Sequence, residues 1–177
     1  MAKLVKKVTK RASARKLEIV GWRELVSFPQ WGIRNILAKI DTGARTSSIH
    51  AEHIEELPDG ALSFRVVLDR ASGHYVQVKA PRARTARVRP STGARQERHV
   101  VQANIRVGQH TYSVEISLVS RKDMMCRMLV GRAALKRRFA VDPARTFLQS
   151  GKPGQKLRKK MLTKRQVSKR AKARASA

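Results

Sequence analysis

The 177-residue sequence predicts one mostly β domain, residues 17–150, between two basic tails, 1–16 and 151–177. Within 17–150, apolar residues recur in short runs rich in Val and Ile, separated by turn-forming residues, a pattern typical of strands rather than helices. The tails hold seven and eleven Lys or Arg and no acidic residue, so they supply +18 of the net charge of +28. Such blocks of like charge bury too little apolar surface to offset the entropy of ordering, so we expect disordered tails.

The first half of the domain contains several apolar runs that indicate strands. The loop between the last two runs has a length suited to a hairpin. The expected strands are Ile19–Trp22, Glu24–Phe28, Ile36–Ile40, Leu62–Leu68 and His74–Ala80, with turns at Pro29–Gly32 and Asp69–Gly73.

Two hairpins are expected next. Arg82–Arg89 and Glu97–Val101 flank Pro90–Arg95, where Pro, Ser, Thr and Gly indicate an exposed tip with the character of a flap. Val100–Val107 and Thr111–Val119 then alternate around a glycine-containing turn, which is a second hairpin signature.

The end of the domain combines a strand, a helix and a closing strand. Met128–Arg132 is an apolar strand that reaches a glycine, and Ala133–Phe139 follows as the expected short C-terminal helix. Val141–Leu148 is expected to close the sheet.

The tripeptide Asp41-Thr42-Gly43 is the candidate catalytic motif. Alone it is a weak signal, because Asp and Gly favour turns. Here an apolar strand delivers Asp41 into a glycine-containing turn, and a second apolar strand ends at Gly131-Arg132 before a helix. Together these two segments resemble the two halves of an aspartic-protease lobe.

This arrangement resembles retroviral-type aspartic proteases. A more specific resemblance is to the bacterial family labelled ATP-dependent zinc protease, which is regarded as retropepsin-like, and it spans about residues 19–149. The segments that carry it are Gly21-Trp22-Arg23-Glu24, Ala38 to Ala51 around Asp41-Thr42-Gly43-Ala44, Arg127 to Arg132, and Phe139 to Pro143. The resemblance implies a retropepsin-like (acid protease) β-barrel half and an aspartic endopeptidase activity.

Hydrolysis by this mechanism needs two carboxylates that face one water, one ionised as general base and one protonated as general acid. The chain has one Asp-Thr-Gly, so the resemblance implies a homodimer in which an identical subunit supplies the second Asp41. Within each half, Thr42 would bond across the dimer axis, and Gly43 and Ala44 would complete the turn. Gly131 would pack beneath it. Arg132 would be a buried guanidinium that pairs with backbone or with a carboxylate.

Two alternatives remain open for the function. A fold can persist without its chemistry, so a noncatalytic peptide-binding module is the first. A zinc-dependent protease is the second, with His50 and His53 as the ligand candidates because residues at i and i+3 can share a helical face. The sequence contains neither a G-x4-G-K-[ST] phosphate loop nor an H-E-x-x-H zinc helix, so nothing in it requires ATP or zinc as a cofactor.

Partners and compartment follow from charge, cysteine content and family. The basic tails are expected either to contact RNA, ribosomes or acidic proteins or to act only as solubility tails. A single cysteine, Cys126, fits the reducing cytoplasm, and no apolar signal or membrane segment is apparent, although an organellar transit peptide is an alternative. The family is often encoded near RimK-type ATP-grasp ligases, which add glutamates to a ribosomal protein or make related peptide bonds. A functional link to such a ligase is therefore implied.

Overall fold

The computed structural model describes residues 16–68, 73–88 and 96–153, and this part of the chain is mostly β, as the sequence predicts. It contains one short α-helix and one 3-10 turn. The elements are β1 (Glu18–Gly21), β2 (Arg23–Phe28), η1 (Pro29–Trp31), β3 (Ile33–Asp41), β4 (Ser47–Glu56), β5 (Ala61–Val67), β6 (Tyr75–Val88), β7 (Gln96–Val107), β8 (His110–Val119), β9 (Met128–Gly131), α1 (Arg132–Leu135) and β10 (Phe139–Asp142).

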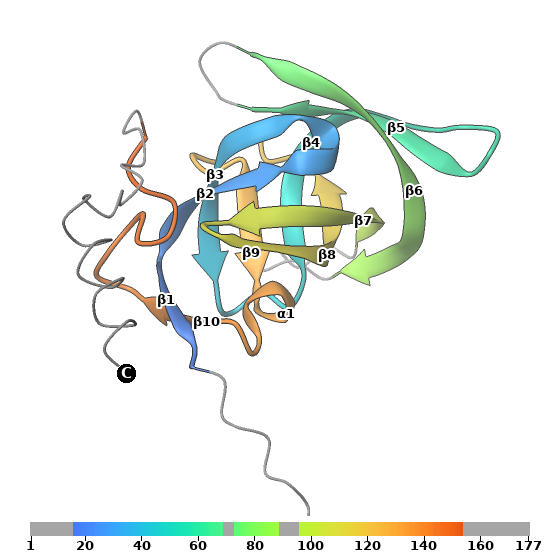
Figure 1. Cartoon of the computed structure of the whole chain (residues 1–177). Helices are drawn as coiled ribbons and strands as arrows, with labels where there is room; N and C mark the ends of the chain where they lie inside the picture. The colour runs from blue at the N-terminus through green and yellow to red at the C-terminus, as the bar shows by residue number, and fades with distance from the viewer. Residues whose placement is uncertain (1–15, 69–72, 89–95, 154–177) are drawn as a thin grey trace, which may run out of the picture.

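The main sheet closes on itself as a barrel. Its order is β2-β3-β9-β4-β5-β6-β7-β8, and the additional pairings β2–β7 and β4–β8 join strands that are distant in this order. The strands β2, β3, β9, β4, β8 and β7 therefore form a ring, from which β5 and β6 extend as a long hairpin arm (Figure 1). The remaining strands, β1 and β10, pair in parallel beside the barrel.

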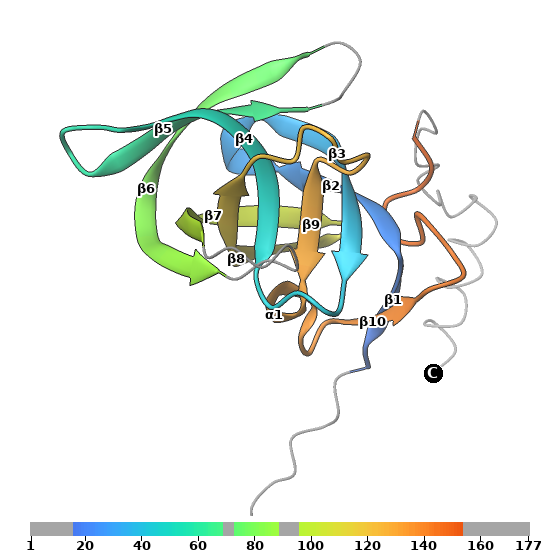
Figure 2. The same ribbon diagram turned by 180° about the vertical axis from the view of Figure 1, so that it is seen from behind.

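Strand β9 holds the centre of the barrel wall. It runs parallel to β3, with Asp41 opposite Gly131, and antiparallel to β4. Figure 2 shows β9 between β3 and β4, with α1 at its end. This pairing brings the two sequence-predicted halves of the site, ninety positions apart, to neighbouring strand ends.

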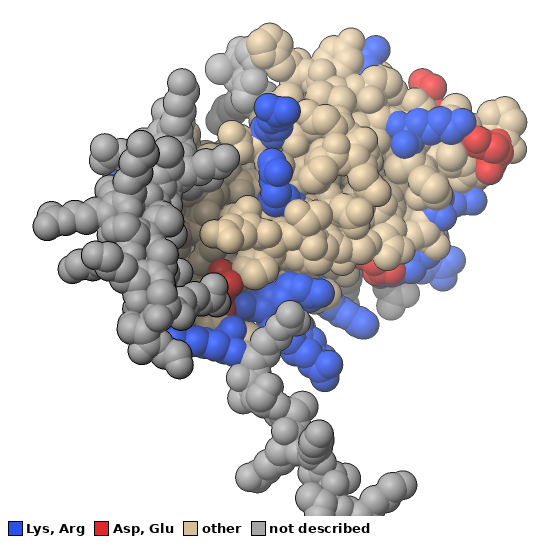
Figure 3. Space-filling view, viewed as in Figure 1, with Lys and Arg blue, Asp and Glu red and all other residues tan. Residues whose placement is uncertain are grey.

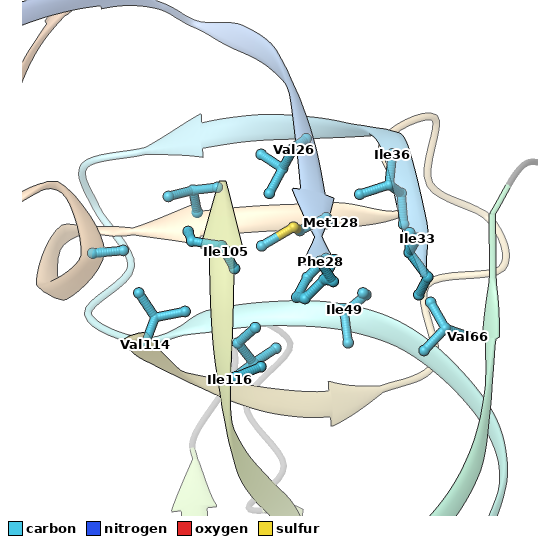
Figure 4. Packing of buried hydrophobic residues seen from close by; sticks show 14 of the residues in the cluster. Val26, Phe28, Ile33, Ile36, Ile49, Val66, Ile105, Val114, Ile116 and Met128 are labelled. Carbon is cyan, nitrogen blue, oxygen red and sulfur yellow. The ribbon is translucent and has the colours of Figure 1, made fainter. Parts of the chain in front are cut away.

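Apolar side chains from the ring of strands fill the barrel. Val26, Phe28, Ile36, Ile105 and Met128 are each at most 2% exposed, and Figure 4 shows them converging from β2, β3, β7 and β9. Trp31 from η1 stacks on Phe28, with ring centroids 4.6 Å apart. Burial of this apolar surface is the main favourable free energy that holds the strands in register.

Two strands are longer than the sequence indicates. The runs His74–Ala80 and Arg82–Arg89 were expected as separate strands, yet β6 continues from Tyr75 to Val88 through a register shift between Arg82 and Arg84. Similarly, β7 is one strand that pairs with β6 through its first half and with β8 along its second half. When a strand changes partners midway, the pattern of buried and exposed side chains differs between its two halves. Its sequence therefore resembles that of two strands.

Strand β4 was not predicted. Its sequence, Ser-Ser-Ile-His-Ala at the start, lacks the alternation of a half-buried strand, because both faces are buried there between β9 and β8. The possible helical face of His50 and His53 is therefore wrong, since both residues lie in a strand. His53 has a left-handed φ of 49°, at the register shift between Glu52 and Glu55.

The C-terminal elements are shorter than predicted. The helix expected at Ala133–Phe139 covers Arg132–Leu135, because Arg137 adopts a left-handed φ of 63° and the next strand begins at Phe139. The segment Val141–Leu148 was expected to close the sheet, but β10 ends at Asp142, and its partner among the described strands is β1.

Several expectations fall on residues that the structure does not describe. They are the basic tails, 1–15 and 154–177, the hairpin loop 69–72 and the predicted flap tip around Pro90–Arg95. In the described ranges, no helix has the length and apolar character needed to cross a membrane.

A buried carboxylate fastens the end of the domain to the barrel. Glu24 on β2 is 0% exposed, and its carboxylate accepts hydrogen bonds from the backbone N–H groups of Gly21, Leu148 and Ser150 at 2.8, 2.9 and 3.1 Å. The Ser150 hydroxyl donates a further bond of 2.6 Å. Because a buried charge needs such partners, Glu24 ties the segment after β10 to β2.

We expect Glu24→Gln to lower the free energy of unfolding by about 2–4 kcal/mol, because the amide removes the charge and turns one acceptor into a donor among N–H groups. Chemical denaturation followed by circular dichroism measures the change. Glu55→Gln, at an exposed position on β4, is the matched control and should shift stability by less than about 0.5 kcal/mol. Equal stabilities for the two variants would contradict this role of Glu24.

Candidate active site

Asp41 stands at the end of β3, and its side chain organises the turn that follows. The Oδ1 atom accepts hydrogen bonds from the backbone N–H groups of Gly43 at 2.9 Å and Ala44 at 3.0 Å. A Cβ atom at residue 43 would lie 3.2 Å from the same oxygen, so glycine allows the backbone to approach the carboxylate. Since Oδ1 takes both of these bonds, the orientation of the carboxylate is fixed by the turn itself.

Arg132 secures the opposite, carbonyl side of this turn. One guanidinium nitrogen donates to the backbone oxygens of Thr42 and Gly43 at 3.2 and 3.3 Å, and the Arg132 backbone N–H donates to the Ala44 oxygen at 2.8 Å. The guanidinium was expected to be buried, but Arg132 is exposed. It pairs with backbone rather than with a carboxylate. The nearby carboxylate of β10, that of Asp142, binds Arg145 at 2.6 Å.

Gly131 is packed against the returning end of the same turn. A Cβ atom there would lie 2.7 Å from the backbone carbon of Thr46 and 2.8 Å from the backbone oxygen of Arg45. The Gly131 N–H donates to the buried Ser47 hydroxyl at 3.1 Å. Ser47 was not a predicted site residue, and only the unusual burial of a serine at the start of β4 identifies it.

An open cleft of about 1680 Å³ lies in front of Asp41. Its walls come from the turn after β3, from strands β4, β6, β7, β8 and β9, and from the segment between β8 and β9. Five arginines line it against three acidic residues. The arginines are Arg45, Arg84, Arg87, Arg98 and Arg121, and the acids are Asp41, Glu97 and Glu115.

Ion pairs neutralise two of these arginines. Arg84 binds Glu115 at 2.7 Å and Arg87 binds Glu97 at 2.9 Å, and the bond to Arg84 lowers the pKa of the Glu115 carboxyl. Three arginines and one acid, Asp41, are left, so the cleft keeps a formal excess of two positive charges. Basic side chains also cover more of the molecular face seen in Figure 3 than acidic ones do.

Comparison with known proteins identifies the family of the chain. The model of the RimB-like family, described as retropepsin-like aspartic endopeptidase RimB, matches residues 19–152. The chain belongs to the RimB-like family. Its retropepsin-like fold is thereby shown, and the resemblance inferred from the sequence is confirmed.

Relatives of this chain are named as ligases, whereas the family model is described as an endopeptidase. Proteins from Shewanella halifaxensis and Desulfotalea psychrophila, both called "Probable alpha-L-glutamate ligase", are 32% and 35% identical to this chain over 133 residues. The matches cover 73% and 72% of this chain but only 29% and 28% of those proteins. The chain thus spans less than a third of the length of these relatives.

A solved structure shares the fold. It is a Legionella pneumophila protein of unknown function, 27% identical, with a TM-score of 0.62. The similarity covers 75% of this chain and 98% of that protein, so the RimB-like domain corresponds to nearly all of the Legionella chain.

The histidines considered as zinc ligands have different surroundings in this RimB-like domain. His50 is 1% exposed, whereas His53 is exposed. Both ring nitrogens of His50 have protein partners, the Arg121 N–H at 3.0 Å and the Glu52 carboxylate at 3.2 Å. Within the described ranges, no three His, Cys, Asp or Glu side chains are grouped as metal ligands would be.

The structure thus brings together Asp41, Thr42, Gly43, Ala44, Gly131 and Arg132, the site residues named from the sequence. Sequence patterns did not identify the arginines of the cleft. They come from four separate segments, and only the closure of the barrel places them around one cavity.

We expect Gly131→Ala to lower the free energy of unfolding by more than about 2 kcal/mol, because its Cβ would overlap backbone atoms of the turn that cannot rotate away. Gly43→Ala is the matched comparison, since its Cβ would contact a side-chain oxygen at 3.2 Å. It should cost less than about 1 kcal/mol. Thermal unfolding of both variants measures the difference, and a Gly131→Ala protein as stable as wild type would show that the turn packs elsewhere.

Proposed function

We propose that this chain is an aspartic endopeptidase that hydrolyses peptide bonds as a homodimer. The observation that carries the proposal is the carboxylate of Asp41, which is oriented by two backbone N–H groups and lines an open cleft. The membership in a family described as retropepsin-like aspartic endopeptidase supports it.

The chemistry requires a second carboxylate, and one chain supplies a single Asp-Thr-Gly. In the proposed dimer, Asp41 of each subunit faces the same water molecule. One carboxylate is ionised and removes a proton from the water, while the other is protonated and donates to the oxygen of the scissile carbonyl. The water oxygen then bonds to the carbonyl carbon, and the C–N bond breaks as the amine takes up a proton.

We also infer that the substrate is an acidic peptide. The excess positive charge of the cleft attracts carboxylates and favours their binding over neutral or basic side chains. The name of the relatives, alpha-L-glutamate ligase, supports glutamate as the acidic residue. A peptidase of this specificity would act on the kind of bond that such a ligase makes, which gives a reason for the functional link to an ATP-grasp ligase.

We expect Asp41→Asn to abolish peptide cleavage while it preserves folding and dimerisation, because the amide keeps the size of the carboxylate but cannot act as a base. Cleavage is followed by mass spectrometry, and the oligomeric state by sedimentation velocity. Asp59→Asn, in an exposed turn, is the control and should retain activity. A statine-type transition-state analogue should inhibit the wild-type protein.

Two outcomes of these measurements would overturn the aspartic mechanism. Cleavage that persists in Asp41→Asn but stops with a chelator and returns with zinc would favour the metal-dependent alternative. A well-folded dimer that binds acidic peptides, never cleaves them and ignores the statine would favour the noncatalytic peptide-binding module.

We expect a tetra-glutamate substrate to be cleaved with a kcat/KM at least about tenfold above that of its glutamine analogue, since the two peptides differ only in charge. The advantage should shrink as salt rises, because exposed charges are screened. Steady-state assays at two ionic strengths measure both effects. Equal kcat/KM values for the two peptides at low salt would contradict the proposed acidic specificity but not the proposed peptidase activity.

A further inference from the structure

The segment between β8 and β9, residues 120–127, carries Arg121 and Met124 into the wall of the cleft. Strand pairing does not hold this segment, because β8 ends at Val119 and β9 begins at Met128. Its position depends instead on buried polar side chains. Two of them, His50 and Arg127, play no part in the chemistry proposed above.

These two side chains hold both backbone polar groups of Arg121. The Arg121 N–H donates to Nδ1 of His50 at 3.0 Å, and the Arg121 oxygen accepts a bond of 3.2 Å from the Arg127 guanidinium. His50 and Arg127 are 1% and 6% exposed, and they are joined to each other by a backbone bond of 2.8 Å. Arg127 also donates to the Lys122 oxygen at 3.2 Å.

The protonation state of His50 suits this role. Burial, followed by the charge of Arg127, lowers the pKa of the imidazole, so the ring is neutral near pH 7. Nε2 lies 3.2 Å from the Glu52 carboxylate and therefore carries the ring hydrogen. Nδ1 is left with the lone pair that accepts the Arg121 N–H.

The guanidinium that this network positions is a cation partly withdrawn from water. Its Nε donates to the Cys126 backbone oxygen at 3.3 Å, and one terminal nitrogen donates to the Ser48 hydroxyl at 3.4 Å. Burial lowers the pKa of the Arg121 guanidinium, and the nearby negative charge of Asp41 opposes that effect. None of the ion pairs found among the described residues includes Arg121.

We propose that Arg121 is the residue that selects an acidic side chain of the substrate beside Asp41, and that His50 and Arg127 are the positioning residues that hold it. This inference rests on the proposed function. A desolvated guanidinium gains most from a carboxylate, which it binds through two parallel hydrogen bonds. Arg84 and Arg87 already have carboxylate partners within the chain, so Arg121 is better placed than these two to receive one from the substrate.

The test measures binding separately from catalysis. The full-length chain carries Asp41→Asn to prevent turnover, and fluorescence anisotropy measures the Kd of labelled tetra-glutamate and tetra-glutamine peptides at about 0.3 M salt, where long-range attraction by other basic residues is screened. Arg121→Gln should weaken binding of the glutamate peptide about 10- to 100-fold and leave the glutamine peptide unchanged. Arg106→Gln, an exposed arginine on β7 away from the cleft, removes the same charge and should have little effect.

The positioning role of His50 has its own pair of variants. His50→Leu cannot accept the Arg121 N–H, so the glutamate peptide should bind at least about fivefold more weakly. His50→Asn places an amide oxygen near the position of Nδ1 and should restore most of the affinity. Thermal unfolding of both variants shows whether they are folded. A purely structural role of His50 would weaken the binding of both peptides equally, whereas a positioning role weakens the binding of the glutamate peptide alone. When the same His50 substitutions are made in the active chain, with Asp41 retained, the loss should appear in KM rather than in kcat.

The outcomes distinguish this inference from the function on which it rests. If the wild-type chain cleaves peptides while Arg121→Gln keeps full preference for glutamate, the role of Arg121 is wrong and the peptidase stands. If the chain cleaves no peptide but Arg121→Gln still selectively loses the glutamate peptide, the recognition stands and the peptidase is wrong. Loss of affinity for both peptides in Arg121→Gln would also overturn the inference.

Discussion

The site depends on one constraint, which is the close packing of a backbone turn over a residue without a side chain. Parallel pairing of β3 and β9 sets Asp41 opposite Gly131, and the turn then folds back until Thr46 and Arg45 occupy the space where a Cβ of residue 131 would be. Only this return brings the Ala44 oxygen to the first N–H of α1. The orientation of the Asp41 carboxylate follows, since its partners are N–H groups of the same turn.

Buried polar side chains fix the positions of two segments that lie outside the barrel strands. A closed barrel satisfies the backbone groups of its strands by pairing, but residues 120–127 and 143–150 lie outside the strand pairs of the described part of the chain. Glu24 holds the second of these segments through its carboxylate, and His50 with Arg127 holds the first. Each of these charged or polar groups is kept in the interior because hydrogen bonds satisfy it there: Glu24 and Arg127 take several backbone partners, and His50 takes the Arg121 N–H and the Glu52 carboxylate.

The sequence predicts those parts of the molecule whose signals are local. The strand before Asp41, the glycine that ends β9 and the hairpin at Gly108 each have a periodicity or turn residue that can be recognised in one segment. Strand β4 could not be found in this way, because its buried start holds Ser47, Ser48 and His50, polar residues whose burial depends on partners distant in sequence. The same reason hides the cleft arginines, which only tertiary closure gathers. The length of α1 depends on a left-handed Arg137 that no residue preference indicates.

Symmetry gives the proposed recognition a consequence for the position of the cut. In a two-fold homodimer each subunit contributes one Asp41 and one Arg121, so the scissile bond would lie between two equivalent guanidinium groups. A chain of acidic residues that passes through such a site places carboxylates on both sides of the bond and can bind both groups. A substrate that has acidic residues on just one side of the scissile bond binds one guanidinium group and loses the affinity that the second would contribute. The same arrangement therefore favours cleavage within an acidic run over removal of a single terminal residue, which accords with an endopeptidase.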